Sequence, residues 1–397
     1  MIETVSPESV EMSSDRLKAI DIAMQGLVDE GRLAGISTLI ARRGKVVHFG
    51  CYGKLDMAAD KPIHSDSLFR IYSLTKPITS VAALILYEAG HFDLNDPVSK
   101  WIHEFKDFQV LQESAHLGLE LNVPAREMTI WHLLTHTSGL GYGFDPQPIE
   151  PIEALYRDAK IFNIASLSFA MSLPEIIQTI ATLPLAARPG EIWHYGLSHD
   201  VLGYLIELIS GVPFDEFLHE RIFEPLHMSD TSFYVPQEKL ERFGPLYSAP
   251  GENGISIFDE VNTSAYIRPD VVPGGGGGLV SSMTDYLSFM LMLANRGELN
   301  GVRLLKQSTV KTMTTNQLSG SAFPVRFGNE PWQGMGFGLG IGVQVIDPIQ
   351  FGWIGLSGTS AWIFPREDMI VIAMPQALGY GEAGDMLLKM AREAIMI

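Results

Sequence analysis

The first sixty residues change from a helical to an extended pattern of hydrophobic positions. Over residues 14–32 the apolar residues recur at the spacing of one helix face, which predicts a helix. The next stretch, ISTLIARRGKVVHFGCYG, predicts two strands that form a hairpin at Arg43 and Gly44. The chain therefore opens with a helix followed by a strand pair.

The C-terminal third is also rich in strand patterns. GFGLGIGVQVI, TSAWIFP and MIVIAMP are short strand candidates, the turn PRED joins the last two, and GEAGDMLLKMAREAIMI predicts a closing helix. Helical patterns and loops dominate residues 77–270. This order predicts an α/β (α+β) fold, in which the N- and C-terminal segments form one antiparallel sheet flanked by helices. We expect residues 1–76 and 275–397 to form this α/β domain and residues 77–274 to form an inserted, mainly helical domain.

The glycine run at 274–278 lies at the second domain boundary. A run of this kind could be a linker. However, the residues that follow, LVSSMTDYLSFMLMLAN, predict a helix that starts with a capping box between Ser282 and Asp285. We therefore interpret the run as a tight backbone passage.

Composition narrows the classes of function. The net charge of −18 and the pI near 5.0 argue against nucleic acid or an anionic membrane as a partner. Cys51 is the only cysteine, which excludes an internal disulfide. The longest apolar stretches fall short of the ~18 residues that span a bilayer. The start, MIETVSPESVEMSSDR, has no signal-peptide pattern, so we expect a cytoplasmic protein of undetermined oligomeric state.

A serine and a lysine stand three residues apart in RIYSLTKPITSVAALILYEAG, at Ser73 and Lys76. At helical spacing the hydroxyl and the amine can meet, and Pro77 fits only if the helix has just begun. Ser73 then lies where unpaired N–H groups can bind a developing oxyanion. Serine needs a base to become a nucleophile, and a lysine buried against this apolar helix can be that base.

The S-x-x-K pattern alone is weak evidence. A second copy, Ser308 to Lys311, occurs in the polar stretch LLKQSTVKTMTTNQ, where an ordinary solvated surface is expected. One of the two copies is therefore a coincidence, and only context favours Ser73. Three other segments supply that context: LLTHTSGLGYGF with Tyr142, WHYGLSHDVLGYLIELISG with Tyr195, and FGWIGLSGTSAWIFP with Trp353.

In this order, and together with FEPLHMSDT at 223–231 and GGGGLVSS, these segments resemble the serine β-lactamase and penicillin-binding-protein fold. The resemblance is closest to the family VIII carboxylesterases, which are similar to class C β-lactamases, and covers roughly residues 15–390. It implies an active site between the two domains, with no metal and no cofactor.

The resemblance also implies a role for each matching position. Ser73 would be the acylated nucleophile, Lys76 its base or the group that holds a base, and Tyr195 the tyrosine that shares a proton with that lysine. Tyr142 would be a second active-site tyrosine. The strand Trp353-Ile354-Gly355 would match the K-T-G or H-T-G box. The backbone N–H groups of Ser73 and Leu356 would form the oxyanion hole.

Two departures from the lactamase pattern change the expected substrate. Leu197 stands where lactamases carry Asn, and Trp353 stands where they carry Lys or His. Both replace polar recognition by apolar surface, which favours neutral, apolar acyl groups. We expect Tyr142, Leu197, Trp353 and Gly355 to contact the substrate. We hypothesise a serine carboxylesterase that hydrolyses short-chain carboxylic esters through an acyl-enzyme on Ser73. The alternatives are a β-lactamase, a D-amino acid peptidase, an acyltransferase, or a non-catalytic sensor on the same scaffold.

The histidines give no independent signal. His132 and His136 have the spacing of H-E-x-x-H, but the glutamate is missing, so we expect no zinc site and expect His136 to fix its turn by hydrogen bonds. His194 and His199 flank Tyr195, where they could contact substrate, but we expect them to be surface histidines. The chain has no G-x-S-x-G, so a serine esterase here must use a scaffold other than the α/β-hydrolase fold.

Overall fold

The computed structural model describes residues 2–114, 118–144, 150–163, 166–251, 254–327 and 330–396. Its centre is an eight-stranded sheet in the order β16-β17-β18-β19-β20-β1-β2-β3, in which neighbouring strands are antiparallel. β1 from the N-terminal segment pairs with β20 from the C-terminal segment, with Ile36 opposite Pro375 and Arg42 opposite Met369. The predicted sheet built from both ends of the chain is confirmed. The strands are β1 (Gly35–Arg42), β2 (Lys45–Asp56), β3 (Lys61–Pro62), β16 (Met335–Phe337), β17 (Gly342–Gln344), β18 (Gln350–Ile354), β19 (Ser360–Phe364) and β20 (Met369–Pro375).

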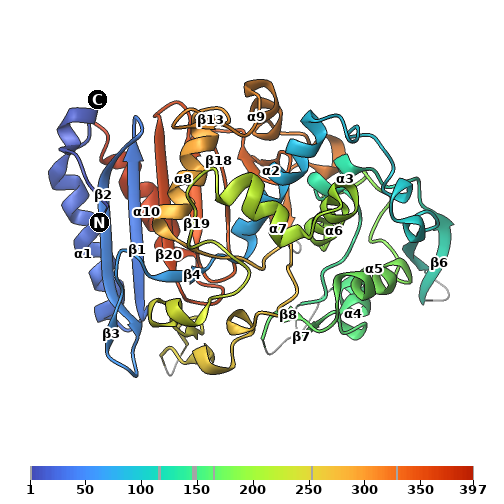
Figure 1. Cartoon of the computed structure of the whole chain (residues 1–397), viewed down its shortest axis with the longest axis horizontal. Helices are drawn as coiled ribbons and strands as arrows, with labels where there is room; N and C mark the ends of the chain where they lie inside the picture. The colour runs from blue at the N-terminus through green and yellow to red at the C-terminus, as the bar shows by residue number, and fades with distance from the viewer. Residues whose placement is uncertain are drawn as a thin grey trace.

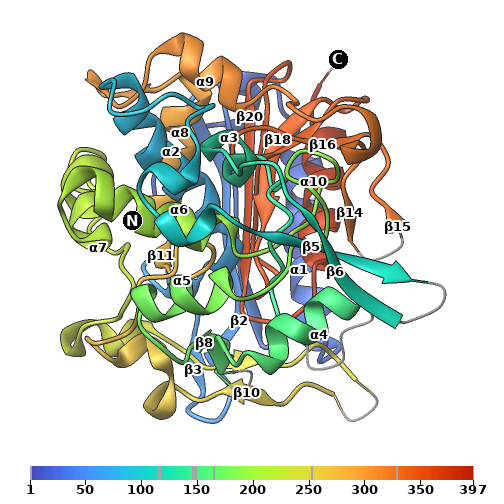
Figure 2. The same ribbon diagram turned by 90° about the vertical axis from the view of Figure 1, so that its right-hand side faces the viewer.

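Helices cover both faces of this sheet. α1 (Ser14–Asp29) and α10 (Glu382–Glu393) contact each other and pack on one face, while α8 (Met283–Ala294) packs against β19 and β20 on the other (Figures 1 and 2). Every residue of β1 and of β20 is buried, as expected for central strands covered on both sides. The β1–β2 hairpin turns at Arg43 and Gly44, whose φ angles of 51° and 70° suit the primed turns that connect twisted strands. The predicted terminal helices and hairpin are therefore present.

One strand prediction differs from the structure. The stretch GFGLGIGVQVI forms two short strands, β16 and β17, rather than one. Gly340, with φ 78°, lies in the turn between them, and an added Cβ there would lie 1.7 Å from the Ser80 hydroxyl oxygen. The chain turns at this point because it passes directly against the neighbouring helix.

The inserted segment consists mainly of helices and lies on the side of the sheet away from α1 (Figure 1). α2 is buried from Thr75 to Leu86 and packs on α6, which agrees with its continuous apolar sequence. The helices of the inserted segment are α2 (Thr75–Glu88), α3 (Ile130–Leu134), α4 (Pro151–Asp158), α5 (Leu173–Ala181), α6 (Ser198–Ser210) and α7 (Phe214–Leu218). Short strand pairs, which the sequence pattern did not indicate, occur here too: β5 (Gln109–Ser114) with β6 (Gly118–Pro124), β7 (Phe162–Asn163) with β8 (Ser168–Phe169), and β9 (Leu246–Tyr247) with β10 (Ile257–Asp259).

The remaining elements connect these parts. β4 (Leu68–Arg70) pairs with β11 (Val280–Ser282), directly before the predicted helix α8. The elements beyond α8 are β12 (Glu298–Leu299), β13 (Val302–Arg303), α9 (Gln307–Met313), β14 (Arg326–Phe327) and β15 (Glu330–Pro331). Within the described ranges, no helix is long and apolar enough to cross a membrane.

Only half of the predicted capping box is formed at the start of α8. The Ser282 side chain accepts the Asp285 N–H, as expected of an N-cap serine. The Asp285 carboxylate instead accepts the Asp230 N–H at 2.7 Å and the Thr231 hydroxyl at 2.9 Å. The prediction of a reciprocal box was wrong because a tertiary contact takes the acidic side chain.

Candidate active site

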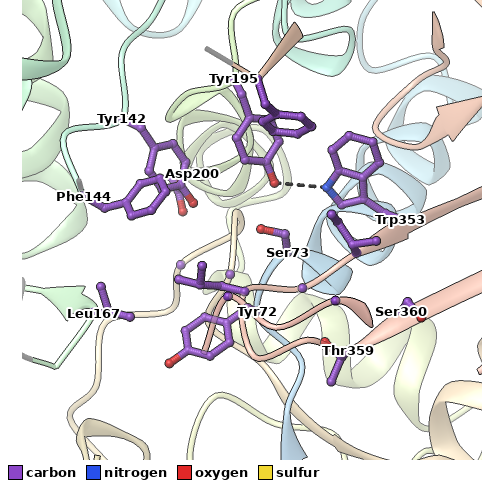
Figure 3. Close-up of a pocket in the computed structure, with 18 of the residues that line it drawn as sticks. Tyr72, Ser73, Tyr142, Phe144, Leu167, Tyr195, Asp200, Trp353, Thr359 and Ser360 are labelled. Carbon is purple, nitrogen blue, oxygen red and sulfur yellow. Dashed lines mark hydrogen bonds between the residues drawn. The ribbon is translucent and has the colours of Figure 1, made fainter. Parts of the chain in front are cut away.

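Ser73 lies in a short 3₁₀ turn, Tyr72–Leu74, that leads directly into α2. The residue before it, Tyr72, has φ 42°, a left-handed conformation that is unfavourable for a bulky side chain and that costs of order 1–3 kcal/mol. Arg70 anchors this turn, because its fully buried guanidinium pairs with Asp259 at 2.7 Å and lies 4.1 Å from the centre of the Phe243 ring. The turn presents Ser73 to a cavity of about 890 Å³ (Figure 3).

Lys76 lies one helical turn further on and is fully buried. Its Nζ donates to the Ser73 hydroxyl oxygen at 3.1 Å and to the Gly276 carbonyl oxygen at 2.6 Å. The same nitrogen lies 4.4 Å from the centre of the Tyr195 ring and 5.4 Å from that of Tyr142. Among the described residues, no carboxylate pairs directly with this amine. The S-x-x-K pair at the head of α2 thus has the contact that proton transfer between serine and lysine requires.

The glycine run passes directly over α2 and α6. The Thr79 hydroxyl donates to the Gly275 carbonyl oxygen at 2.7 Å, and the Gly276 N–H donates to Asp200 Oδ1 at 2.8 Å. A Cβ added at Gly275 would lie 2.3 Å from the His199 carbonyl oxygen, and one at Gly276 would lie 2.5 Å from Asp200 Oδ2. The interpretation as a tight backbone passage is confirmed, and its function is to place a carbonyl oxygen against Lys76.

Asp200 supports this passage and was missed by the sequence analysis. It is buried in the first turn of α6, lines the cavity, and keeps Oδ2 without a hydrogen-bond partner in the described part of the chain. Burial raises the pKa of Asp200 from 3.8 to about 6, although Lys76 and the Gly276 N–H act in the opposite direction. An acidic residue in the first turn of α6, directly before the apolar residues of that helix, was the signal that could have revealed it.

We expect Asp200 to give the protein a measurable pH dependence of stability. Because its folded pKa lies above the unfolded value, the wild type binds a proton more tightly when folded and loses stability as the pH rises through about 6. Asp200→Asn lacks this titration. Its free energy of unfolding relative to wild type should therefore rise between pH 4 and pH 7, by up to roughly 3 kcal/mol. Urea-unfolding midpoints across this range test it, and a flat difference would show that the carboxyl has its ordinary pKa.

Tyr195 lies between the lysine and the strand β18. Its hydroxyl oxygen accepts the Trp353 indole N–H at 3.1 Å, while its ring face covers the Lys76 amine (Figure 3). The structure thus brings Tyr195, Ser73 and Lys76 into one cavity. The hydroxyl itself does not bond to Ser73 or Lys76 among the described contacts. Proton sharing between Tyr195 and Lys76 stays a prediction.

Tyr142 stacks on Tyr195 with ring centres 5.7 Å apart and an interplanar angle of 13°. Burial raises the pKa of Tyr142 well above its usual range, so it stays a neutral phenol. Glu153 of α4 holds its loop by accepting the N–H groups of Tyr142 at 3.0 Å and Gly143 at 2.8 Å. Burial raises the pKa of Glu153, but hydrogen bonds from His194 and Gly143 leave it below the usual value.

The residue predicted to be an oxyanion donor, Leu356, lies just beyond the end of β18. Gly355 and Leu356 line the cavity, and a Cβ at Gly355 would lie 2.4 Å from the Ile71 carbonyl oxygen, which explains the glycine. In the described part of the chain, the N–H groups of Ser73 and Leu356 make no hydrogen bond to protein atoms. The Ser357 hydroxyl donates to the Arg70 carbonyl oxygen at 2.7 Å and so ties the end of β18 to the Ser73 turn. That these two N–H groups bind one oxyanion stays a prediction.

Three sequence predictions do not match the structure. Leu197, expected to contact substrate, is fully buried in the hydrophobic core and does not line the cavity. His199, expected at the surface, is fully buried with its Nε2 3.0 Å from the Ser80 hydroxyl. His194 is not a free surface residue either, since it lines the cavity and bonds to Glu153 at 3.0 Å. Leu197 and His199 face inward because α6 packs against both α2 and α3.

His136 lies beneath Tyr195, with ring centres 4.7 Å apart, and accepts the Gly196 N–H at 3.4 Å. This contact agrees with the expected turn-fixing function. Burial lowers the pKa values of His136 and His199 well below their usual range, so both are neutral beneath Lys76. No cluster of His, Cys, Asp and Glu suited to a metal occurs in the described ranges.

Comparison with known proteins identifies the family to which this arrangement belongs. A Beta-lactamase family model matches residues 20–394. The chain belongs to the beta-lactamase family. Among curated members, Protein Rv1367c of Mycobacterium tuberculosis is 33% identical over 368 residues, covering 89% of this chain and 88% of that protein. Esterase EstB of Burkholderia gladioli is 30% identical over 299 residues, covering 72% of each.

Solved structures show the same beta-lactamase/transpeptidase-like fold. EstCE1, described as a hydrolase with promiscuous acyltransferase activity, superposes with a TM-score of 0.77 at 24% identity and covers 98% of this chain and 99% of its own. Simvastatin synthase LovD of Aspergillus terreus gives a TM-score of 0.79 at 22% identity and covers 97% and 98%. The predicted fold class is confirmed for this beta-lactamase family member.

Proposed function

We propose that this beta-lactamase family member is a serine carboxylesterase of the family VIII type, which hydrolyses short-chain carboxylic esters through an acyl-enzyme on Ser73. The observation that carries the proposal is the 3.1 Å contact between the Ser73 hydroxyl and Lys76 Nζ at the floor of the large cavity. Esterase EstB and lovastatin esterase of Penicillium rubens are relatives at 30% and 29% identity, and their names support ester hydrolysis.

The geometry supports a two-step reaction. Ser73 Oγ attacks the ester carbonyl carbon, and its proton passes to Lys76 Nζ, which acts as the base. The carbonyl oxygen becomes an oxyanion between the Ser73 and Leu356 N–H groups, each worth about 10²–10³ in rate. The bond to the alcohol oxygen then breaks, and a proton relayed through Tyr195 leaves with the alcohol. Water attacks the acyl-enzyme in the same way, and the carboxylic acid leaves with Ser73 restored.

Trp353 favours esters over lactams in this scheme. It is almost fully buried, lines the cavity and directs its indole N–H at Tyr195, so it offers no cation to a substrate carboxylate. We expect p-nitrophenyl butyrate to be hydrolysed with a kcat/KM at least about a hundredfold above that for nitrocefin, because the anionic lactam loses a charge-assisted bond and must desolvate its carboxylate.

The two substrates are compared with one protein preparation, and mass spectrometry of the protein trapped with a slow acyl substrate locates the adduct. An adduct on Ser73 together with the ester preference is the expected result. A clear preference for nitrocefin would instead favour the β-lactamase alternative. A protein that forms no adduct and is not labelled by a fluorophosphonate would favour a non-catalytic sensor.

An acyltransferase is the second candidate. The cavity extends to both sides of Ser73, which leaves room for an alcohol beside the acyl-enzyme (Figure 3). Acyltransferase calJ of Penicillium decumbens is a relative at 29% identity. Adding a second alcohol during turnover and measuring new ester against free acid separates the two reactions.

A further inference from the structure

Two groups of aromatic residues in the cavity meet at Tyr195. The first wall consists of Tyr142, Phe144, Phe162 and Phe169, in which neighbouring ring centres lie 4.7–5.5 Å apart. The second wall consists of Phe327, Trp332, Trp353 and Trp362, with ring centres 6.0–6.4 Å apart. Tyr142 and Phe144 lie on one side of Ser73 and Trp353 on the other (Figure 3).

Tyr195 touches both walls but directs its hydroxyl to the second. Its ring centre lies 5.7 Å from that of Tyr142, 5.5 Å from that of Phe327 and 5.8 Å from that of Trp353. The hydroxyl oxygen is bonded to the Trp353 indole N–H. A proton donor must lie within hydrogen-bond distance of the atom that receives the proton. The leaving oxygen of an ester therefore lies next to Trp353.

We infer that the second wall binds the alcohol half of the ester, and that the preferred alcohol carries a flat, uncharged aromatic group, while the acyl group lies against the first wall. This inference rests on the proposed function, since it uses Tyr195 as the proton donor to the leaving group. The rings of the second wall pack on one another, with centres about 6 Å apart, and so form one continuous aromatic group against which a ligand ring can pack. Phe327 is also 42% exposed, and a flat ligand would cover it.

Charge decides between a neutral and a cationic alcohol. Aromatic rings also attract quaternary ammonium groups. However, Arg326 lines the cavity and is the direct neighbour of Phe327 in β14. Acidic residues line the cavity as well: Glu150 and Glu153 beside the first wall, where Glu153 accepts the Tyr142 N–H, Asp200 of α6, and Asp385 of α10. Because Arg326 adjoins Phe327, on which the ligand ring would stack, a neutral ring is favoured over the cationic group of choline.

Three butyrate esters test the assignment: methyl butyrate, 2-naphthylmethyl butyrate and butyrylcholine. The wild type should show a kcat/KM for the naphthylmethyl ester about tenfold or more above that for the methyl ester, since stacking adds to area burial. Phe327→Ala should reduce this ratio at least about fivefold and Phe327→Leu by less, because leucine keeps apolar area but loses the ring. Phe258→Ala is the matched control, since Phe258 is an exposed ring of β10 that does not line the cavity.

A second ester, methyl 2-naphthylacetate, carries the same ring on the acyl side. Phe327→Ala could lower kcat/KM for methyl 2-naphthylacetate and leave the ratio of kcat/KM between 2-naphthylmethyl butyrate and methyl butyrate unchanged. That result would show that the assignment of the two ester halves to the two walls is wrong. A higher kcat/KM for butyrylcholine than for 2-naphthylmethyl butyrate would overturn the inference that the preferred alcohol is uncharged. A ratio of kcat/KM between the naphthylmethyl and methyl esters that is the same in the wild type and all variants would overturn the second wall as a binding surface. In these outcomes methyl butyrate is still hydrolysed, so the proposed function stands. No turnover of any ester and no label on Ser73 would overturn both.

Discussion

Replacing Ser73 by alanine is expected to abolish hydrolysis of p-nitrophenyl butyrate, with a loss of at least ~10⁴-fold in kcat. The reason is that the proposed mechanism acylates Ser73 Oγ, and alanine leaves no nucleophile beside Lys76. The substitution removes one oxygen atom at a partly buried position, so the fold should persist. Initial rates and fluorophosphonate labelling measure the effect.

The chain offers a matched control in its second S-x-x-K. Ser308 lies in α9, where it and Lys311 are exposed. Ser308→Ala should keep wild-type activity and wild-type labelling. If Ser73→Ala keeps full activity, or if Ser308→Ala is the variant that loses it, the acyl-enzyme assignment is wrong. Circular dichroism and thermal unfolding of both variants confirm that they are folded.

Replacing Lys76 by methionine is expected to lower kcat by about 10²–10⁴-fold, the usual contribution of a positioned acid or base. Methionine is unbranched and apolar, so it can fill the buried space between Ser73 and the rings of Tyr142 and Tyr195. It removes the hydrogen bonds to the Ser73 hydroxyl and the Gly276 carbonyl oxygen. Stopped-flow measurement of the acylation step isolates the effect from deacylation.

Lys311→Met is the control for this experiment, since it removes an exposed lysine from the same motif. It should leave acylation unchanged. The Lys76 variant should be destabilised as well, because the buried Gly276 carbonyl oxygen loses its donor, an effect of about 1–3 kcal/mol. A Lys76→Met protein that acylates within a few-fold of the wild-type rate would show that another group takes the proton from Ser73.

Local patterns were sufficient for the parts of the site that lie close together in the sequence. The serine followed by an apolar helix correctly indicated a buried Lys76 next to Ser73, since both depend on one helical turn. The glycine run correctly marked a place where backbone approaches backbone, at Gly275. The sheet followed from strand patterns at both ends of the chain.

The sequence did not indicate which face of α6 points inward. Leu197 and His199 were misplaced, and Asp200 was missed, because their burial depends on how α6 packs against α2 and against the glycine run. The aromatic walls likewise join residues from segments more than a hundred positions apart, such as Tyr195 and Phe327. Such contacts carry no periodic signal in a single sequence.

The bond from the Ser357 hydroxyl to the Arg70 carbonyl oxygen spans 287 positions of the chain. The two N–H groups proposed to bind the oxyanion are therefore supplied by segments that the ribosome makes at widely separated times. In the proposed mechanism, a nascent chain in which β18 has not yet docked against the Ser73 turn cannot stabilise a tetrahedral adduct. We therefore expect activity to appear only after these two segments have met.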